Sequence, residues 1–314
     1  MSRQAIIIDC DPGVDDAIAL FLAFASPERL DILAVTTAAG NVDATLTARN
    51  ARLVRQLAGR QDVPVHAGAA APLVREPIAA AHFHGESGLG TLPVFEPEAP
   101  TAPGHAANVI VDIVMSRPAG SVSMAVTGPM TNLALAMRLE PAIVDRLGAV
   151  VVMGGARTEG GNITASAEYN IFADPHAADV VFRSGVKCVV LGLDATHQVR
   201  ATPERLARIK AIDTAAARSV ATLIAFSSDI ERRLVGGDSP PMHDPCTIAY
   251  LLAPELFTAA PVDLRVETAS PLTAGHTAVE FRLGAAAASV APIRWVTKVD
   301  HEAVFELIFD RLAR

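Results

Sequence analysis

The sequence contains little cysteine, few aromatic side chains and little basic charge. Of its 314 residues, 3 are Cys, 1 is Trp and 2 are Tyr, and the formal net charge is -8. Three cysteines cannot all pair within one chain and show no metal-binding spacing, so we predict reduced, mostly buried thiols in a cytoplasmic protein. The acidic balance, with no cluster of basic residues, argues against binding to nucleic acid.

Long apolar runs and targeting signals are also missing. No apolar run reaches the length needed to span a membrane, so we expect no membrane contact. The first residues lack the basic region, apolar stretch and cleavage site of a signal peptide, which agrees with a cytoplasmic location. Hydrophobic residues make up 51% of the chain and charged residues 19%, which suffices for a sizeable core in one large domain or two small ones.

Strand and helix patterns alternate along the chain. The predicted strands cover residues 5–8, 31–37, 63–66, 122–126, 149–153, 186–191, 262–266, 278–282 and 293–297. The predicted helices cover residues 15–24, 43–57, 106–115, a segment from 131, 175–182, most of 203–234, 244–252 and 301–312. With no repeat or linker, this alternation predicts a single α/β domain over residues 1–314, with a mostly parallel, mixed sheet and helices on both faces. Residues 68–104, rich in Pro, Gly and Ala, are predicted to form a loop or lid.

Four carboxylates gather where the first predicted strand meets the first helix. Residues 5–8 are uniformly apolar, and Pro12 and Gly13 form the turn that follows. The carboxylates belong to Asp9, Asp11, Asp15 and Asp16. They repel one another unless a cation lies among them or some are protonated, and oxygen ligands alone favour Ca²⁺ or Mg²⁺. The alternative is that Asp11 only caps the helix and that Asp15 and Asp16 favour its positive end.

Polar residues follow several other predicted strands, and one further polar pair lies late in the chain. Those after the strands are Asn41, Thr127, Met153 and the group Asn162, Glu168 and Asn170, and the late pair is His243 and Asp244. Each could be a turn or cap residue by itself. Because parallel strands end at one edge of a sheet, we expect them to converge on one pocket.

Such a pocket suits a sugar. Amide and carboxylate groups beside a hard cation can bind hydroxyl groups, and the cation lowers the pKa of bound water. An aspartate, with an ordinary pKa of about 3.9, could then accept a proton from that water. Attack at an anomeric carbon proceeds through an oxocarbenium-like transition state and needs a stabilised leaving group, to which a histidine could give a proton.

Seven motifs in order resemble one family. They are DCDPGVDD (9–16), AGNV (39–42), HGESGLG (84–90), TGPMTN (127–132), MGG (153–155), AEYN (167–170) and HDP (243–245). The chain is similar to the nucleoside hydrolases of the inosine–uridine preferring type. The resemblance implies a Rossmann-like nucleoside hydrolase fold, a homodimer or homotetramer, a role in nucleoside salvage, and Ca²⁺-dependent hydrolysis of ribonucleosides to ribose and a free base.

The resemblance also implies a role for each matching residue. Ca²⁺ would be bound by Asp11, Asp16, the main-chain carbonyl of Thr127, Asp244 and the ribose 2′- and 3′-hydroxyls. Asp15 would be the general base that takes a proton from the metal-bound water, and His243 the proton donor to the leaving base. The residues implied to contact water or substrate are Asn41, Met153, Asn162, Glu168, Asn170 and, from the predicted lid, His84. Asp9 would support the metal ligands without binding the metal itself.

One feature departs from the family and leaves alternatives open. Family members often carry tyrosines on the helix before the HDP motif, whereas residues 224–235 contain Phe226 and no Tyr. The substrate could therefore be a related N-ribosyl metabolite. A phosphatase of the haloacid dehalogenase type, with Asp9 as nucleophile and Asp11 as acid/base, is a weaker alternative because it lacks a well-placed downstream Lys. A non-catalytic sugar- or Ca²⁺-binding module would need neither Asp15 nor His243.

Overall fold

One nine-stranded sheet organises the protein, which is described here from a computed structural model over residues 3–290 and 292–314. The strand order is β3-β2-β1-β4-β5-β6-β9-β7-β8. The strands are β1 (Gln4–Cys10), β2 (Leu30–Thr37), β3 (Val65–Ala67), β4 (Val122–Val126), β5 (Leu147–Met153), β6 (Cys188–Leu191), β7 (Phe257–Val266), β8 (Thr277–Glu280) and β9 (Ile293–Val299). All pairs from β3 to β9 are parallel, and β7 pairs antiparallel with both β9 and β8. The predicted mixed, mostly parallel sheet is therefore confirmed.

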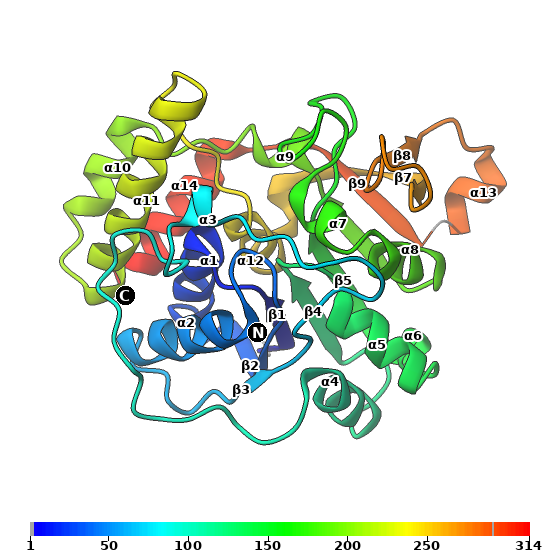
Figure 1. Cartoon of the computed structure of the whole chain (residues 1–314), viewed down its shortest axis with the longest axis horizontal. Coiled ribbons are helices and arrows are strands. Elements are labelled where there is room, and N and C mark those ends of the chain that lie inside the picture. The colour runs from blue at the N-terminus through cyan, green and yellow to red at the C-terminus, as the bar shows by residue number, and fades with distance from the viewer. Residues whose placement is uncertain (1–2, 291) are drawn as a thin grey trace.

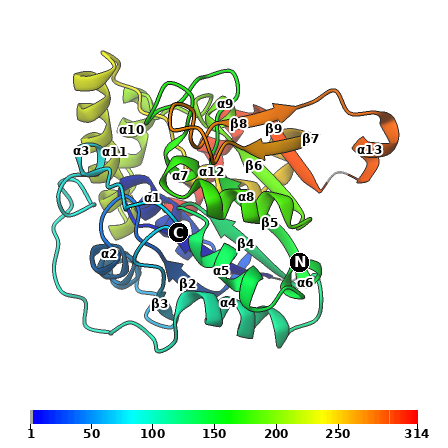
Figure 2. The same cartoon turned by 45° about the vertical axis from the view of Figure 1, so that its right-hand side comes forward.

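Helices cover both faces of this sheet (Figures 1 and 2). The longer ones are α1 (Val14–Phe24), α2 (Ala44–Leu57), α4 (Ala106–Met115), α5 (Thr131–Leu139), α8 (Pro175–Arg183), α10 (Pro203–Lys210), α11 (Ala215–Leu234), α12 (Pro245–Leu252) and α14 (His301–Leu312). The short ones are α3 (Ala81–His84), α6 (Ile143–Arg146), α7 (Tyr169–Ala173), α9 (Leu193–Thr196), α13 (Ala285–Val290) and the 3-10 turn η1 (Pro254–Leu256).

Side-chain alternation along β1 explains the two hydrophobic cores. Ile6 and Ile8 pack into a core that includes α1, α2, α11, α12 and α14, whereas Ile7 packs into a second core with α4, α5 and α8. All three side chains are buried. A strand that is apolar at every position is thus covered on both faces, as a central parallel strand must be.

The differences from the sequence prediction are local. The helical region over residues 203–234 is two helices, α10 and α11, and β7 begins at Phe257, five residues before the predicted strand. The short helices α3, α6, α7, α9 and α13 were not predicted, because segments of four to six residues carry no periodicity that a sequence can show. The three cysteines are free and buried, as predicted. Within the described ranges, no helix is both long and apolar enough to cross a membrane.

The side chain of Asp174 joins three parts of the fold beside the sheet edge that carries the polar residues. It is fully buried and accepts hydrogen bonds from the Leu73 N–H (2.8 Å), the Thr131 hydroxyl (2.7 Å) and the Ala177 N–H (3.0 Å). The bond to Ala177 caps α8, and the bond to Leu73 ties down the predicted loop over residues 68–104. One carboxylate therefore connects a helix end, a second helix and the long loop.

We expect Asp174→Ala to lower the free energy of unfolding by about 3 kcal/mol, because it removes a helix cap and leaves two buried donors unpaired. Urea unfolding followed by circular dichroism measures the change. The control is Asp179→Ala in the same helix, which loses only an ion pair to Arg183 at 3.5 Å and should cost about 0.5 kcal/mol. Equal losses for the two variants would contradict this role of Asp174.

Candidate active site

The turn between β1 and α1 is built around Asp16. Its carboxylate accepts hydrogen bonds from the Gly13 N–H (3.0 Å), the Asp11 N–H (3.3 Å) and the Thr127 hydroxyl (2.7 Å). The side-chain amide of Asn41 also donates to it at 3.0 Å. Asp16 therefore caps α1, whereas the alternative prediction for this stretch assigns the cap to Asp11. The same contacts bring the ends of β1, β2 and β4 together.

Asp11 and Asp9 lie behind this turn, and each keeps one carboxylate oxygen without a hydrogen-bond partner. Asp11 Oδ2 accepts the Asn41 N–H at 2.7 Å, while its Oδ1 is buried and unpaired within the described residues. Asp9 Oδ1 accepts from Thr36 (2.6 Å) and Asn132 (2.9 Å), and its Oδ2 is the second unpaired oxygen. Unpaired buried carboxylate oxygens are costly, and burial raises the pKa of both groups, so each carboxylate needs either a positive partner or a proton.

The carboxylates of Asp15, Asp16 and Asp244 form the cluster itself. One oxygen of each lies within 4.8 Å of the others. Burial raises the pKa of all three, that of Asp16 to about 6, and each neighbouring carboxylate raises the pKa of Asp244 further. Three clustered acids with oxygen donors only, next to the unpaired oxygen of Asp11, fit a hard divalent cation. The structure therefore places an acidic cluster with the composition to hold a metal ion where the sequence predicts a metal site.

Asp11 can lie so close to this cluster because two neighbouring residues are glycines. A Cβ at Gly128 would lie 2.5 Å from Asp11 Oδ1, and a Cβ at Gly40 would overlap Asp11 Oδ2. Both glycines belong to motifs that the sequence analysis singled out. Their role is the close approach of backbone to a carboxylate rather than turn conformation, since neither has a positive φ.

Glu168 and its neighbours form the opposite side of the site. Glu168 caps α7 by accepting the N–H groups of Asn170 (2.9 Å) and Ile171 (3.2 Å), and it also accepts the Gly155 N–H (2.9 Å). Burial raises the pKa of Glu168 to about 7. Asn170 donates to the main-chain carbonyl of Thr127 at 2.7 Å, the group that the resemblance assigns to the metal. These residues are therefore held mainly by backbone contacts.

Asn162 and Tyr169 complete this side. Asn162 Oδ1 accepts the Tyr169 N–H at 2.9 Å, and the Tyr169 hydroxyl donates to the carbonyl of Ile78 at 2.7 Å. The hydroxyl therefore connects the Glu168 segment to the long loop over residues 68–104.

Two histidines lie between these sides. His84, at the end of α3 in the long loop, accepts the Val14 N–H on Nδ1 at 3.0 Å, and burial lowers its pKa to about 4. His243 Nδ1 lies 2.8 Å from the Thr196 hydroxyl, and burial together with His197 lowers its pKa to about 3. Both imidazoles are therefore neutral at pH 7.

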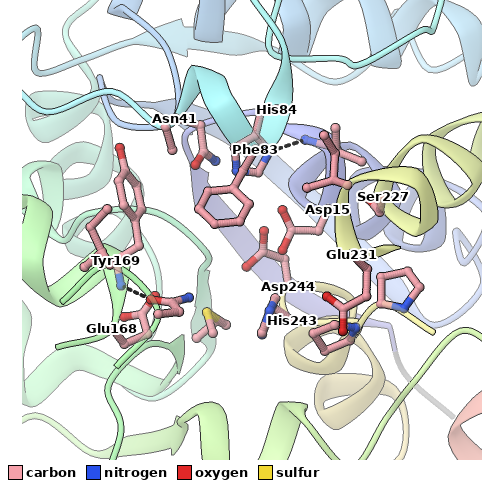
Figure 3. Close-up of a pocket in the computed structure, with 18 of the residues that line it drawn as sticks. Asp15, Asn41, Phe83, His84, Glu168, Tyr169, Ser227, Glu231, His243 and Asp244 are labelled. Carbon is pink, nitrogen blue, oxygen red and sulfur yellow. Dashed lines mark hydrogen bonds between the residues drawn. The ribbon is translucent and has the colours of Figure 1, made fainter. Parts of the chain in front are cut away.

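One pocket of about 440 Å³ receives almost all of the predicted site residues. Figure 3 shows Glu168 and Tyr169 on one side, the α11 residues Ser227 and Glu231 on the other, and Asp15 with Asp244 between them. The predicted residues that line the pocket are Asp15, Asn41, His84, Thr127, Met153, Asn162, Glu168, Asn170, His243 and Asp244. Asp11 and Asp16 do not line it and are fully buried beneath it. The expected convergence of strand ends is thus observed.

The sequence analysis missed the wall that α11 and the loops beside it provide. The lining residues that it did not name as candidates include Phe83, His197, Arg200, Ser227, Ile230, Glu231, Leu234, Pro240 and Pro241. The spacing of Ser227, Ile230, Glu231 and Leu234 marks one face of a helix and could have indicated them. Phe226, the one aromatic residue noted there, packs instead near Gly85 and Gly90 of the long loop.

The fold and the pocket together define an α/β enzyme with an acidic site at the carboxyl edge of its sheet. The family model for inosine-uridine preferring nucleoside hydrolases matches residues 6–306. The inosine-uridine preferring nucleoside hydrolase of Crithidia fasciculata is 41% identical over 312 residues, covering 99% of this chain and 98% of the relative. The pyrimidine-specific ribonucleoside hydrolase RihA of Photobacterium profundum is 44% identical over 281 residues, covering 89% of each chain.

Solved structures agree with these sequence matches. A plant nucleoside hydrolase, PpNRh1, superposes with a TM-score of 0.91 at 32% identity, covering 99% of each chain. A purine-preferring ribonucleoside hydrolase from Gardnerella vaginalis superposes with a TM-score of 0.90 at 29% identity, covering 99% of this chain and 98% of the other. The chain belongs to the inosine-uridine preferring nucleoside hydrolase family. The predicted family, fold and enzyme class, an N-glycosidase of ribonucleosides, are confirmed, and the phosphatase and sugar-binding alternatives have no support.

Proposed function

We propose that this protein hydrolyses the N-glycosidic bond of ribonucleosides with Ca²⁺ in the site and Asp15 as the general base. The observation that carries the proposal is the cluster of Asp15, Asp16 and Asp244 at the pocket. Asp15 and Asp244 line the pocket, whereas Asp16 is buried beneath it. Asp15 can therefore contact a substrate directly, whereas Asp16 can act only from beneath the pocket, as a ligand of the cation.

The cation would be held by Asp11, Asp16, Asp244 and the carbonyl of Thr127. When bound, it would lower the pKa of the attacking water and bind the 2′- and 3′-hydroxyls of ribose. The unpaired Oδ1 of Asp11 supports this ligand set, because a carboxylate oxygen buried without a partner needs one.

The remaining polar residues would position the sugar. Asp15 takes the proton of the attacking water, and Asn41, fixed by the backbone of Asp11 (3.1 Å), orients that water or the ribose. Asn162, Glu168 and Asn170 bind the sugar hydroxyls, with Met153 packed beside them. Their own backbone hydrogen bonds fix them before the substrate arrives, which lowers the cost of ordering the site.

His243 would assist the departing base. Because burial lowers its pKa to about 3, the ring acts as a neutral hydrogen-bond donor rather than as an imidazolium. Its Nδ1 is occupied by the Thr196 hydroxyl at 2.8 Å, which leaves Nε2 for the substrate. His84 would close the site from the long loop. We further propose a cytoplasmic homodimer or homotetramer of single-domain subunits that serves nucleoside salvage.

The test is ribose release from inosine, adenosine, guanosine, uridine and cytidine, each with and without a chelator. We expect release from at least one nucleoside and its loss when the chelator is present. Release that the chelator does not affect would contradict the metal-assisted mechanism. No release from any nucleoside by folded, Ca²⁺-loaded protein would contradict the proposed substrate class and favour a different N-ribosyl metabolite.

A further inference from the structure

The wall formed by α11 lies across the pocket from the sugar-binding side (Figure 3). Its apolar part consists of Ile230 and Leu234 from α11 together with Pro240 and Pro241, and Phe83 of α3 lines the same pocket. Such a surface suits the flat faces of a nucleobase. Because the proposed function places ribose against Asp15, Asp244 and Glu168, the base must extend toward this wall.

One charged pair interrupts the apolar wall. Glu231 Oε1 accepts a hydrogen bond from Arg200 Nη1 at 3.2 Å, and the same Nη1 donates to the carbonyl of Ser239 at 3.0 Å. The side chain of Glu231 is only 15% exposed and lines the pocket. Glu231 Oε2 and Arg200 Nη2 form no hydrogen bond with any residue that the structure describes. The pair therefore offers one acceptor and one donor beside each other at the place where the base must lie.

We propose that Glu231 determines nucleobase specificity by accepting a hydrogen bond from a ring N–H, while Arg200 donates to the carbonyl next to that N–H. This inference rests on the proposed function. The pair matches bases whose edge carries an N–H beside a C=O. Arg200 would also stabilise the negative charge that such a carbonyl gains when the base departs, which compensates for the absence of tyrosines from α11.

An ion pair that only joined α11 to the loop carrying Arg200 would have no need to face the pocket. Glu231 is instead mostly buried and lines the pocket, and its Oε2 has no partner among the described residues. Asp229 lies two residues earlier in α11, on a face that does not line the pocket, and it shows the purely structural pattern: its side chain is 65% exposed and pairs with Arg232 at 2.7 Å. Asp229→Ala is therefore a matched control for Glu231→Ala.

The experiment compares uridine with 3-methyluridine and inosine with 1-methylinosine, because methylation removes the ring N–H and leaves the glycosidic bond intact. We measure kcat/KM for the wild type, Glu231→Ala and Asp229→Ala, all loaded with Ca²⁺. In at least one pair we expect methylation to lower kcat/KM of the wild type by about 10- to 100-fold, the cost of losing a hydrogen bond to a charged group. In Glu231→Ala, kcat/KM for the unmethylated substrate should fall by a similar factor. The ratio of kcat/KM between the unmethylated and methylated substrates should therefore approach 1.

Each outcome decides between the possibilities. Asp229→Ala should keep the wild-type ratio. The same ratio in Glu231→Ala as in the wild type, or a wild-type ratio near 1 for both pairs, would overturn this inference while the proposed function stands. If the wild type releases ribose from neither uridine nor inosine, and from no other nucleoside of the panel, both this inference and the proposed function are overturned.

Discussion

Replacing Asp15 by Asn should lower kcat for ribonucleoside hydrolysis by about 10²- to 10⁴-fold, the range that a general base contributes. The carboxylate of Asp15 lines the pocket beside Asp244, and an amide of the same shape cannot accept the proton of the attacking water. The fold should be preserved, because the turn between β1 and α1 is held by Asp16 rather than by Asp15. Initial rates of ribose release under saturating Ca²⁺ measure the loss.

The control is Asp112→Asn, which removes an exposed carboxylate from α4 and should leave kcat unchanged. Binding separates the role of a base from that of a ligand for substrate. Equilibrium dialysis with the best nucleoside should give a Kd for Asp15→Asn within a few fold of the KM of the wild type. A variant that keeps most of its turnover would show that another group accepts the proton.

The sheet and the position of the site could be predicted from the sequence because both depend on local patterns. Residues 5–8 are apolar without alternation, which is typical of a central parallel strand, and the alternation with helices indicates one mostly parallel sheet. In a parallel sheet the polar residues after each strand then share one edge. That rule accounts for Asn41, Thr127 and Met153 in the same pocket, whereas Asp244 enters it from the start of α12.

The partners of these side chains could not be predicted. Glu168 caps α7, a five-residue helix without a sequence signature, and its three backbone donors come from two separate segments. Asp11 lies beneath the pocket rather than in its wall. This position depends on the close packing of Gly40 and Gly128 against the Asp11 carboxylate. The order of motifs in a sequence can indicate that residues lie close together. It does not show which hydrogen-bond partner each side-chain atom has.

The α11 wall was missed for another reason. The sequence analysis looked for aromatic residues there, as the family resemblance suggested, and found only Phe226, which packs against the long loop. Glu231 and Arg200 are 31 residues apart and on different elements, so only the folded chain shows that they pair. The residues of the acidic cluster belong to recognisable motifs, whereas neither Glu231 nor Arg200 does, so this pair is harder to predict from the sequence.

Removing the divalent cation should abolish hydrolysis and also destabilise the fold. Asp11, Asp15, Asp16 and Asp244 are held close together, and burial raises the pKa of each, so that without a cation they must either repel one another or take up protons. A cation at 100 times its Kd stabilises the native state by about 2.7 kcal/mol if it binds only that state. For a chain of this size we expect Tm to fall by about 5 °C when a chelator is added and to recover with excess Ca²⁺.

Asp244→Asn provides the matched variant, because it removes one carboxylate of the cluster and keeps the shape of the side chain. Its Tm without cation should be equal to or higher than that of the wild type, since one of the repelling charges is gone, and it should gain much less from added Ca²⁺. The variant should be inactive at the Ca²⁺ concentration that half-saturates the wild type. A wild-type Tm that does not respond to the chelator, with full activity at a metal content far below one ion per chain, would show that the carboxylates act without a cation. The unpaired oxygens of Asp9 and Asp11 would then have to be protonated in the native state.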